Sequence, residues 1–213
     1  MHIGFPNVTV TQNEAAIILH SQQPLQILSS AVVGGGLIRA HYILNCHVRK
    51  GYCHPNPATD LAHMVQNLGI MEPFVGMMTA ARMHEARAIV LQEEDITVAA
   101  IVTAGLSNPS SPGLSPPATS KPGTINLILL VDAHLTPAAL VNAVITATEA
   151  KAQIVLAYGT RTPEGYAATG TSTDAIVVAC TGRGEALPYT GPVTLVGWLI
   201  GRCIRTALAA TLA

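Results

Sequence analysis

Short runs of apolar residues, some alternating with polar residues and some continuous, recur along most of the chain and predict β-strands. We expect strands over residues 8–12, 15–20, 25–28, 38–48, 75–82, 86–92, 97–103, 124–131 and 175–180. The runs at 97–103 and 124–131 are almost wholly apolar, which indicates central positions in a sheet. Asn126 is a polar residue inside the second of these runs.

Three stretches predict helices. The expected helices cover residues 60–68, with Thr59 or Asp60 as the cap, 137–156 and 193–211. Two of the three come late in the chain and do not alternate with strands, which favours an α+β (mixed α/β) fold. We expect one domain over residues 1–213, in which a few helices cover a mostly β-sheet core. The pattern leaves the strand order open.

Residues 105–123 break this pattern, because they contain five prolines and five serines. A structureless loop of this length is usually either a functional lid or a disordered insertion, and both alternatives stay open. Neither flank forms a complete domain without the other. We therefore interpret the segment as a loop insertion within a single domain.

Composition and charge argue against two kinds of partner. Charged residues make up 11% of the chain and the net charge is −1, so we expect no surface for nucleic acid or anionic lipid. The stretch 193–213 is apolar enough to raise the question of a membrane helix. Arg202 and Arg205 would each oppose insertion by about 2.5–3.5 kcal/mol near the bilayer centre. We expect a helix that docks on the sheet, and no membrane insertion.

The chain has four cysteines and no CxxC pair. Cys180 and Cys203 lie inside apolar runs, which is typical of reduced, buried thiols. No basic segment followed by an apolar one opens the chain, and we expect a cytoplasmic protein. Cys46-His47 and Cys53-His54 come nearest to a metal site. Adjacent residues of an extended chain point to opposite faces, so we expect no metal.

Candidate chemistry concentrates in residues 167–174, Ala-Ala-Thr-Gly-Thr-Ser-Thr-Asp, directly before the expected strand at 175–180. Small hydroxyl residues around one glycine leave backbone N–H groups accessible, and Asp174 is carried to the edge of the strand. Such a loop suits an oxyanion, a phosphate or a polar substrate edge. A Gly/Thr turn with Asp174 as a local cap explains the same residues, and the pattern alone does not decide.

A second loop, at residues 34–36, consists of three glycines, so the backbone there either bends sharply or approaches a ligand closely. The helix expected at 137–156 also carries one polar stripe. The stripe consists of Asn142, Thr146, Glu149 and Gln153.

Several short stretches occur together in one order. They are Leu28-Ser-Ser-Ala-Val-Val-Gly-Gly-Gly-Leu37, Asn45, Met77-Met-Thr-Ala-Ala81, Thr103-Ala-Gly-Leu-Ser-Asn108, Gly123-Thr-Ile-Asn126, Thr148-Glu-Ala-Lys-Ala152 and Thr169-Gly-Thr-Ser-Thr-Asp-Ala175. In this order the set resembles the adenosylcobinamide amidohydrolase family, CbiZ, over residues 25–205. Each motif alone is weak, whereas the ordered set is specific.

This resemblance implies a hydrolase of corrinoid (vitamin B12) salvage. Such an enzyme cleaves the amide between a propionate side chain of the corrin ring and aminopropanol, and it releases adenosylcobyric acid and 1-amino-2-propanol. The corrinoid is then the substrate and small-molecule partner, and no cofactor is required. A non-catalytic corrinoid-binding or delivery protein is the competing function. A homo-oligomer stays open.

Amide hydrolysis needs an activated nucleophile, a stabilised oxyanion and a proton for the leaving amine. We expect Glu149 to act as general base or acid, with Asp174 as a second carboxylate beside it. Water is the preferred nucleophile, and the hydroxyls of Ser30, Ser172 and Thr171 are alternatives. Lys151 lies about 200° around the helix from Glu149, which indicates packing or a distant salt bridge. The expected substrate-binding residues are Gly34, Gly35, Gly36, Asn45, Thr124, Asn126, Gly170, Thr171 and Thr173.

Overall fold

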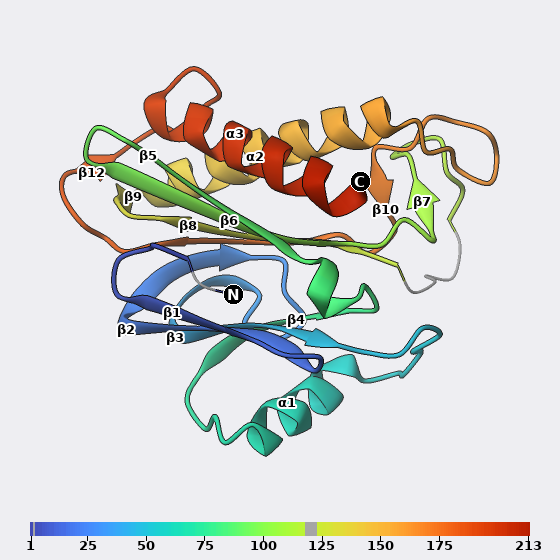
Figure 1. Cartoon of the computed structure of the whole chain (residues 1–213), viewed down its shortest axis with the longest axis horizontal. Helices are drawn as coiled ribbons and strands as arrows, with labels where there is room; N and C mark the ends of the chain where they lie inside the picture. Colours follow the sequence, from blue (N-terminus) through green and yellow to red (C-terminus); the bar gives the residue numbers. More distant parts are fainter. Residues whose placement is uncertain (2, 118–122) are drawn as a thin grey trace.

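A computed structural model describes the whole chain except residues 2 and 118–122. Within the described part, an eight-stranded mixed sheet forms the centre, with the order β4-β3-β2-β11-β8-β6-β5 and β1 paired to β2 (Figure 1). Its strands are β1 (Val8–Gln12), β2 (Ala16–Ser29), β3 (Gly36–His47), β4 (Phe74–Thr79), β5 (Arg87–Glu93), β6 (Ile96–Ala104), β8 (Ile125–Val131) and β11 (Ala175–Cys180).

Each of the three long helices starts at a side chain that accepts a backbone hydrogen bond. Asn56 caps α1 (Pro57–Asn67), Thr136 caps α2 (Pro137–Tyr158) and Thr194 caps α3 (Leu195–Leu212). The predictions of helices over residues 137–156 and 193–211 are confirmed, and each end of α2 and α3 lies within two residues of the predicted end. The helix expected from residue 60 begins at Pro57, because Asn56 rather than Thr59 or Asp60 is its cap.

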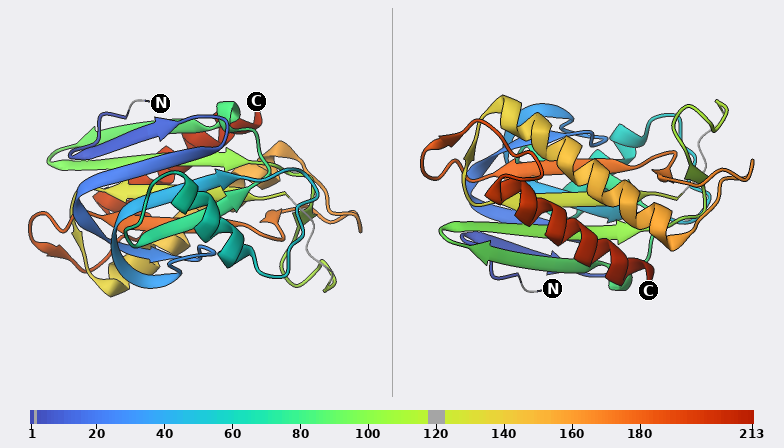
Figure 2. Two further views of the ribbon diagram at one scale, coloured as in Figure 1. Left: turned by 90° about the horizontal axis from the view of Figure 1, so that it is seen from below. Right: turned by 90° about the horizontal axis from the view of Figure 1, so that it is seen from above.

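The sheet is bent into two layers. Helices α2 and α3 lie side by side on β5, β6, β8 and β11, and α1 covers the outer face of β3 and β4 (Figures 1 and 2). The long strand β2 joins the layers, and its pairing with β3 shifts register between His20 and Leu25. An apolar core fills the space between the layers, and its largest fully buried members include Ile17, Ile27, Ile43, Met77, Ile101 and Ile128.

Two small sheets and one short helix complete the described fold. Strand β7 (Pro109–Ser110) pairs with β10 (Gly170–Thr171), and β9 (His134–Leu135) pairs with β12 (Ala186–Leu187). The 3₁₀ helix η1 covers Met83–Glu85. The β7–β10 pair joins the first part of the Pro/Ser insertion to the glycine loop before β11. Residues 118–122 of the insertion lie outside the described residues.

The structure confirms the α+β fold and corrects two strand predictions. The segments 15–20 and 25–28 are one strand, β2, which continues through Pro24 where its register with β3 shifts. The strand predicted over 75–82 ends at Thr79, because the chain turns there into η1.

Helices α2 and α3 are, by length and composition alone, long and apolar enough to cross a membrane. Both nevertheless rest on the sheet, and each contributes fully buried residues such as Leu140 and Ile200 to the core beneath them. Buried core helices of soluble proteins pass the same test, and 39% of the apolar window of α2 and 44% of that of α3 are buried.

Candidate active site

A pocket opens at one end of the bent sheet, where β8 and β11 begin and β3 and β4 end. Its volume is about 390 Å³, and we call it the strand-end pocket. It is lined by Ser30, Val32, Val48, Tyr52, Cys53, His54, Pro57, Met77, Met78, Thr79, Ala80, Gly123, Thr124, Thr173, Asp174 and Ala175. Four of the predicted site residues, Ser30, Thr124, Thr173 and Asp174, therefore meet in one cavity.

Asp174 is held by donors on both carboxylate oxygens. Oδ1 accepts hydrogen bonds from the backbone N–H of Ile125 (3.0 Å) and from the Thr171 hydroxyl (2.5 Å), and the Thr171 N–H approaches both oxygens at 3.2 Å. Oδ2 forms an ion pair of 2.5 Å with Lys151 Nζ, and only 13% of the lysine and 17% of the aspartate side chain are exposed. Asp174 thus fastens the loop before β11 to the start of β8 and to α2.

Gly170 is required by this ion pair. A Cβ atom at this position would overlap both Asp174 Oδ2 and Lys151 Nζ. The glycine of the loop is thus explained by the close approach of two charged side chains, and Asp174 accepts from Thr171 three residues before it, as a local cap would.

A chain of buried side-chain hydrogen bonds lies beside the strand-end pocket. Asn45 Nδ2 donates to Thr103 Oγ1 (2.9 Å), and Asn126 Nδ2 donates to Asn45 Oδ1 (2.8 Å) and to the Met78 carbonyl (2.9 Å). The Thr124 hydroxyl lies within reach of Asn126 Oδ1 (2.9 Å) and the Thr173 carbonyl (2.7 Å), and its single hydrogen is shared between them. We call this set the amide chain.

The residues of the amide chain lie on the same strand faces as the apolar core residues, nearer to the pocket. Side chains two residues apart on a strand point to the same face. Asn45, Thr103 and Asn126 therefore follow the core residues of β3, β6 and β8 toward the pocket. Asn45 and Asn126 are 2% and 1% exposed, so they fix the ends of these strands beside the pocket and do not line it.

The two predicted serines lie in different hollows. Ser30 is exposed and lines the strand-end pocket, and its Oγ accepts a hydrogen bond of 3.0 Å from the Ile176 N–H. Ser172 lines a separate hollow of about 590 Å³ together with the Pro/Ser insertion, where its Oγ accepts from Asn108 Nδ2 (2.7 Å). Thr171 lines that second hollow as well.

The structure does not bring Glu149 together with Asp174. Glu149 is exposed and lines a hollow of about 340 Å³ between α2 and α3, beside Trp198 and Arg202. Lys151, two positions further along α2, points to the opposite side of the helix and reaches Asp174. The expectation of two adjacent carboxylates is corrected accordingly. Lys151, expected to pack or to form a distant salt bridge, is the partner of Asp174.

The triple-glycine loop packs against β4. Gly34 has a φ of +72°, and a Cβ there would collide with the Phe74 carbonyl oxygen. Val33 and Gly76 exchange two backbone hydrogen bonds of 3.1 and 2.9 Å, which tie the loop to the strand. A Cβ at Gly35 would lie 2.9 Å from the Ala31 carbonyl oxygen, whereas Gly36 has open space around its Cβ position and is favoured there by its φ of +90°. None of the three glycines is among the residues that line the strand-end pocket.

The sequence prediction missed the wall formed by the loop before α1. Tyr52, Cys53 and His54 line the strand-end pocket. His54 Nδ1 lies 3.3 Å from Asp60 Oδ2, which also accepts a hydrogen bond of 2.7 Å from the Tyr52 hydroxyl. Burial and this hydrogen bond raise the pKa of the Tyr52 phenol to about 12. In the sequence prediction His54 is a candidate metal ligand only, although a carboxylate, Asp60, follows it six residues later.

Among the described residues, no group of three or more His, Cys, Asp or Glu side chains is placed to hold a metal ion.

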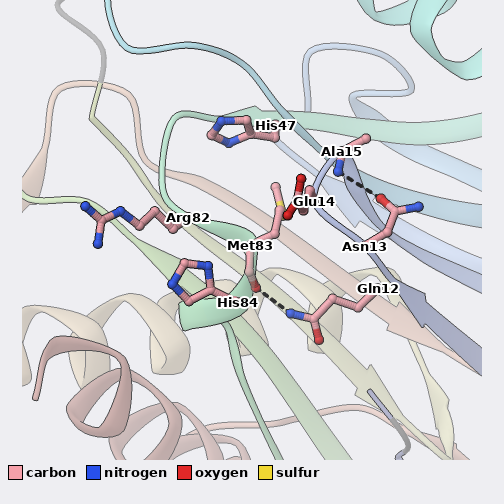
Figure 3. A pocket seen from close by; sticks show the side chains of 8 residues that line it. All are labelled: Gln12, Asn13, Glu14, Ala15, His47, Arg82, Met83 and His84. Carbon is pink, nitrogen blue, oxygen red and sulfur yellow. Dashed lines mark hydrogen bonds between the residues drawn. The ribbon is translucent and has the colours of Figure 1, made fainter.

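The larger hollow beneath the β1–β2 turn, about 770 Å³, contains none of the predicted site residues. Figure 3 shows Glu14, His47 and His84 around it, and the Gln12 side chain donating to the Met83 carbonyl.

Comparisons with known proteins agree with the resemblance drawn from the motifs. A family model described as adenosylcobinamide amidohydrolase (CbiZ) matches residues 5–213. An adenosylcobinamide amidohydrolase of Methanosarcina mazei is 34% identical over 192 residues, which are 86% of this chain and 88% of that protein. A Halobacterium salinarum protein of the same name is 41% identical over 122 residues, 54% of this chain and 50% of that protein.

A crystal structure of a Pyrococcus horikoshii protein aligns with a TM-score of 0.47 and 13% identity, and it covers 95% of this chain and 78% of that one. A likeness of this strength carries no argument about function.

Proposed function

The chain belongs to the adenosylcobinamide amidohydrolase family, and we propose that it hydrolyses the amide between a corrin propionate side chain and aminopropanol. The products would be adenosylcobyric acid and 1-amino-2-propanol. The observation that carries the proposal is the family match over nearly the whole chain. Four of the seven motif stretches also contribute residues to the lining of the strand-end pocket, which supports the proposal.

The size of the pocket fits an amide-bearing side chain. A cavity of about 390 Å³ lies at the small end of the range for ligand sites, about 300–1,000 Å³. It is far smaller than a corrin ring with its cobalt and axial groups. We therefore place the propionamide arm inside the pocket and the ring at its mouth. Val32, which lines the pocket and is 42% exposed, offers an apolar contact for the ring.

The pocket provides groups for the steps of hydrolysis. A water molecule is our preferred nucleophile, and the Ser30 hydroxyl is the alternative that lines the same pocket. The competing route through Ser30 forms an acyl-enzyme. Mass spectrometry after rapid quenching of a turnover mixture decides between them, since an adduct on Ser30 contradicts attack by water.

We propose that the enzyme acts in the cytoplasm on a small-molecule corrinoid. The reaction consumes only water and the corrinoid, so it calls for no added cofactor. The net charge of −1 and the absence of a basic run in the sequence are consistent with a partner other than nucleic acid.

The direct test is incubation of the purified protein with adenosylcobinamide, with measurement of both products. We expect 1-amino-2-propanol and adenosylcobyric acid to form in equal amounts. A corrinoid-binding or delivery protein would retain the ligand and release no amine, and this result would overturn the proposal.

A further inference from the structure

The loop between β3 and α1 places an imidazole at the wall of the strand-end pocket, and the first turn of α1 places a carboxylate next to it. His54 lines the pocket, and Asp60, in the first turn of α1, lies 3.3 Å from its Nδ1. Asp60 is itself fixed by the hydrogen bond from Tyr52. The imidazole is thus oriented by a carboxylate that is held from a second side.

Two groups compete for His54 Nδ1. The Asn56 N–H, at 3.3 Å, can donate only to an unprotonated Nδ1, whereas Asp60 can accept only from a protonated one. A hydrogen bond to an ionised acceptor is about twice as strong as a neutral one. The Asp60 contact therefore favours the tautomer with the proton on Nδ1. Nε2 then carries the lone pair and can accept a proton.

We propose that His54 is the proton-transfer residue of the hydrolysis and that Asp60 is its positioning residue; this inference rests on the proposed function. The other carboxylate of the pocket is less suited to this role. Asp174 already has four donors, which are the Lys151 ammonium, the Ile125 N–H, and the N–H and hydroxyl of Thr171. They occupy most of the lone pairs that a base would need.

The step balances without an oxidant or a reductant. His54 Nε2 takes a proton from the attacking water while the water oxygen bonds to the amide carbon. The carbon–nitrogen bond of the tetrahedral intermediate then breaks, and the imidazolium gives its proton to the departing nitrogen. The products are a carboxylic acid and a free amine. Asp60 stabilises the imidazolium that exists between the two steps.

Three other ionisable groups line the pocket with His54: Tyr52, Cys53 and Asp174. From α1, Asp60 contacts it directly. Because the pKa of Tyr52 is raised to about 12, its phenol stays protonated near neutral pH and does not supply the base.

The test measures kcat and KM for adenosylcobinamide in His54→Gln, Asp60→Asn and His63→Gln. His63 is the matched control, an exposed histidine on α1 outside the pocket lining. We expect His54→Gln to lower kcat by about 100- to 10,000-fold with KM nearly unchanged, and Asp60→Asn to lower it by about tenfold. His63→Gln should leave both parameters within about twofold of wild type. Added imidazole should restore turnover to His54→Gly, which a purely structural histidine would not allow.

Wild-type kcat in His54→Gln overturns the inference, as does a loss in His54→Gly that imidazole does not reverse. Should the His54 variants fail to fold, Asp60→Asn decides alone. The inference requires that the pH dependence of kcat in Asp60→Asn differs from that of wild type. A pH profile equal to that of wild type contradicts it. A wild-type protein that releases no amine contradicts the proposed function itself. If wild-type protein turns over adenosylcobinamide and His54→Gln has the same kcat, only the role of His54 is contradicted.

Discussion

The two ends of the β8–β11 pair use the same kinds of group in different surroundings. At the pocket end, Asp174 binds Lys151 and Thr171. At the far end, Asp132 accepts from Arg183 Nε (2.9 Å) and from the Thr181 hydroxyl (2.8 Å). Each carboxylate fastens a loop to the end of a strand.

The surroundings of the two ion pairs differ, although both carboxylates are largely buried, with 17% of the Asp174 and 10% of the Asp132 side chain exposed. Lys151 is 13% exposed, whereas Arg183 is 45% exposed and spans the surface to Asp95. Only the pocket end combines its ion pair with the amide chain and the loop that carries His54. A carboxylate paired with a cation therefore fastens a strand end in both places, and the proposed chemistry depends on the neighbouring pocket and on His54.

The largest effect on stability should come from the pocket-end pair. Asp174→Ala leaves a buried ammonium without its partner, and we expect unfolding free energy to fall by about 3–5 kcal/mol. Urea denaturation measures it. Adding Lys151→Met should recover part of the loss, because the unpaired charge is then removed. A double variant no more stable than Asp174→Ala would show that the buried charge is not the cause.

The second-largest loss of unfolding free energy should come from the amide chain. Asn126→Ala removes the partners of the Asn45 amide oxygen and the Met78 carbonyl, and we expect a loss of about 2–3 kcal/mol. Thr103→Val is the matched control at the end of the chain and should lose about 1 kcal/mol. Equal losses in the two variants would mean that the chain does not act as a connected unit.

The far end should tolerate a change that the pocket end does not. Asp132→Ala breaks hydrogen bonds to a partly exposed arginine, so we expect a loss of about 1–2 kcal/mol with kcat unchanged. Unfolding and turnover are measured on the same preparation. A drop in kcat comparable to that of His54→Gln would remove the functional distinction between the ends.

The thiols at the two ends of the β8–β11 pair should also differ in reactivity. Cys53, at the pocket, is exposed, whereas Cys180, at the far end of β11, is buried, and burial raises the pKa of its thiol. Burial also raises the pKa of Cys46 to about 11 and of Cys203 to about 12, so at pH 8 almost none of either is thiolate. One fast-reacting thiol is expected in the native protein, and Cys53→Ser should abolish it. Fast labelling that persists in that variant would contradict the assignment.

The smallest effect is expected at Glu149, which lies outside the pocket. Glu149→Gln should change unfolding free energy by less than about 0.5 kcal/mol and kcat by less than about twofold, as for other surface substitutions. Steady-state kinetics with adenosylcobinamide check this. Loss of turnover with binding intact would restore Glu149 to the mechanism.

Local patterns predicted the elements because their signals are contained in short stretches. The apolar runs of β6, β8 and β11 specify those strands directly. The helix expected from residue 193 begins two residues later, because Thr194 is its cap. Strand order and the bend at β2 depend on pairings between distant segments, which no short window contains.

The site was predicted in part for the same reason. Asn126 within an apolar run and Asp174 at a strand edge are local anomalies, and both lie at the pocket end. Which side chain pairs with Asp174 depends on how α2 is rotated against the sheet. The sequence showed that Glu149 and Lys151 face opposite sides, but not which of them faces β11. His54 joins the site only because α1 packs on β3 and β4, a tertiary contact without a local signal.

The most direct test of the strand-end pocket as the place of catalysis is to fill it. Cys53→Trp adds bulk to an exposed position in the pocket wall, at a residue that belongs neither to the Asp174 ion pair nor to the amide chain. In folded variant protein we predict that kcat/KM for adenosylcobinamide, followed by amine release, falls by about 100-fold or more relative to wild type. An unchanged kcat/KM in a correctly folded Cys53→Trp protein would contradict the account.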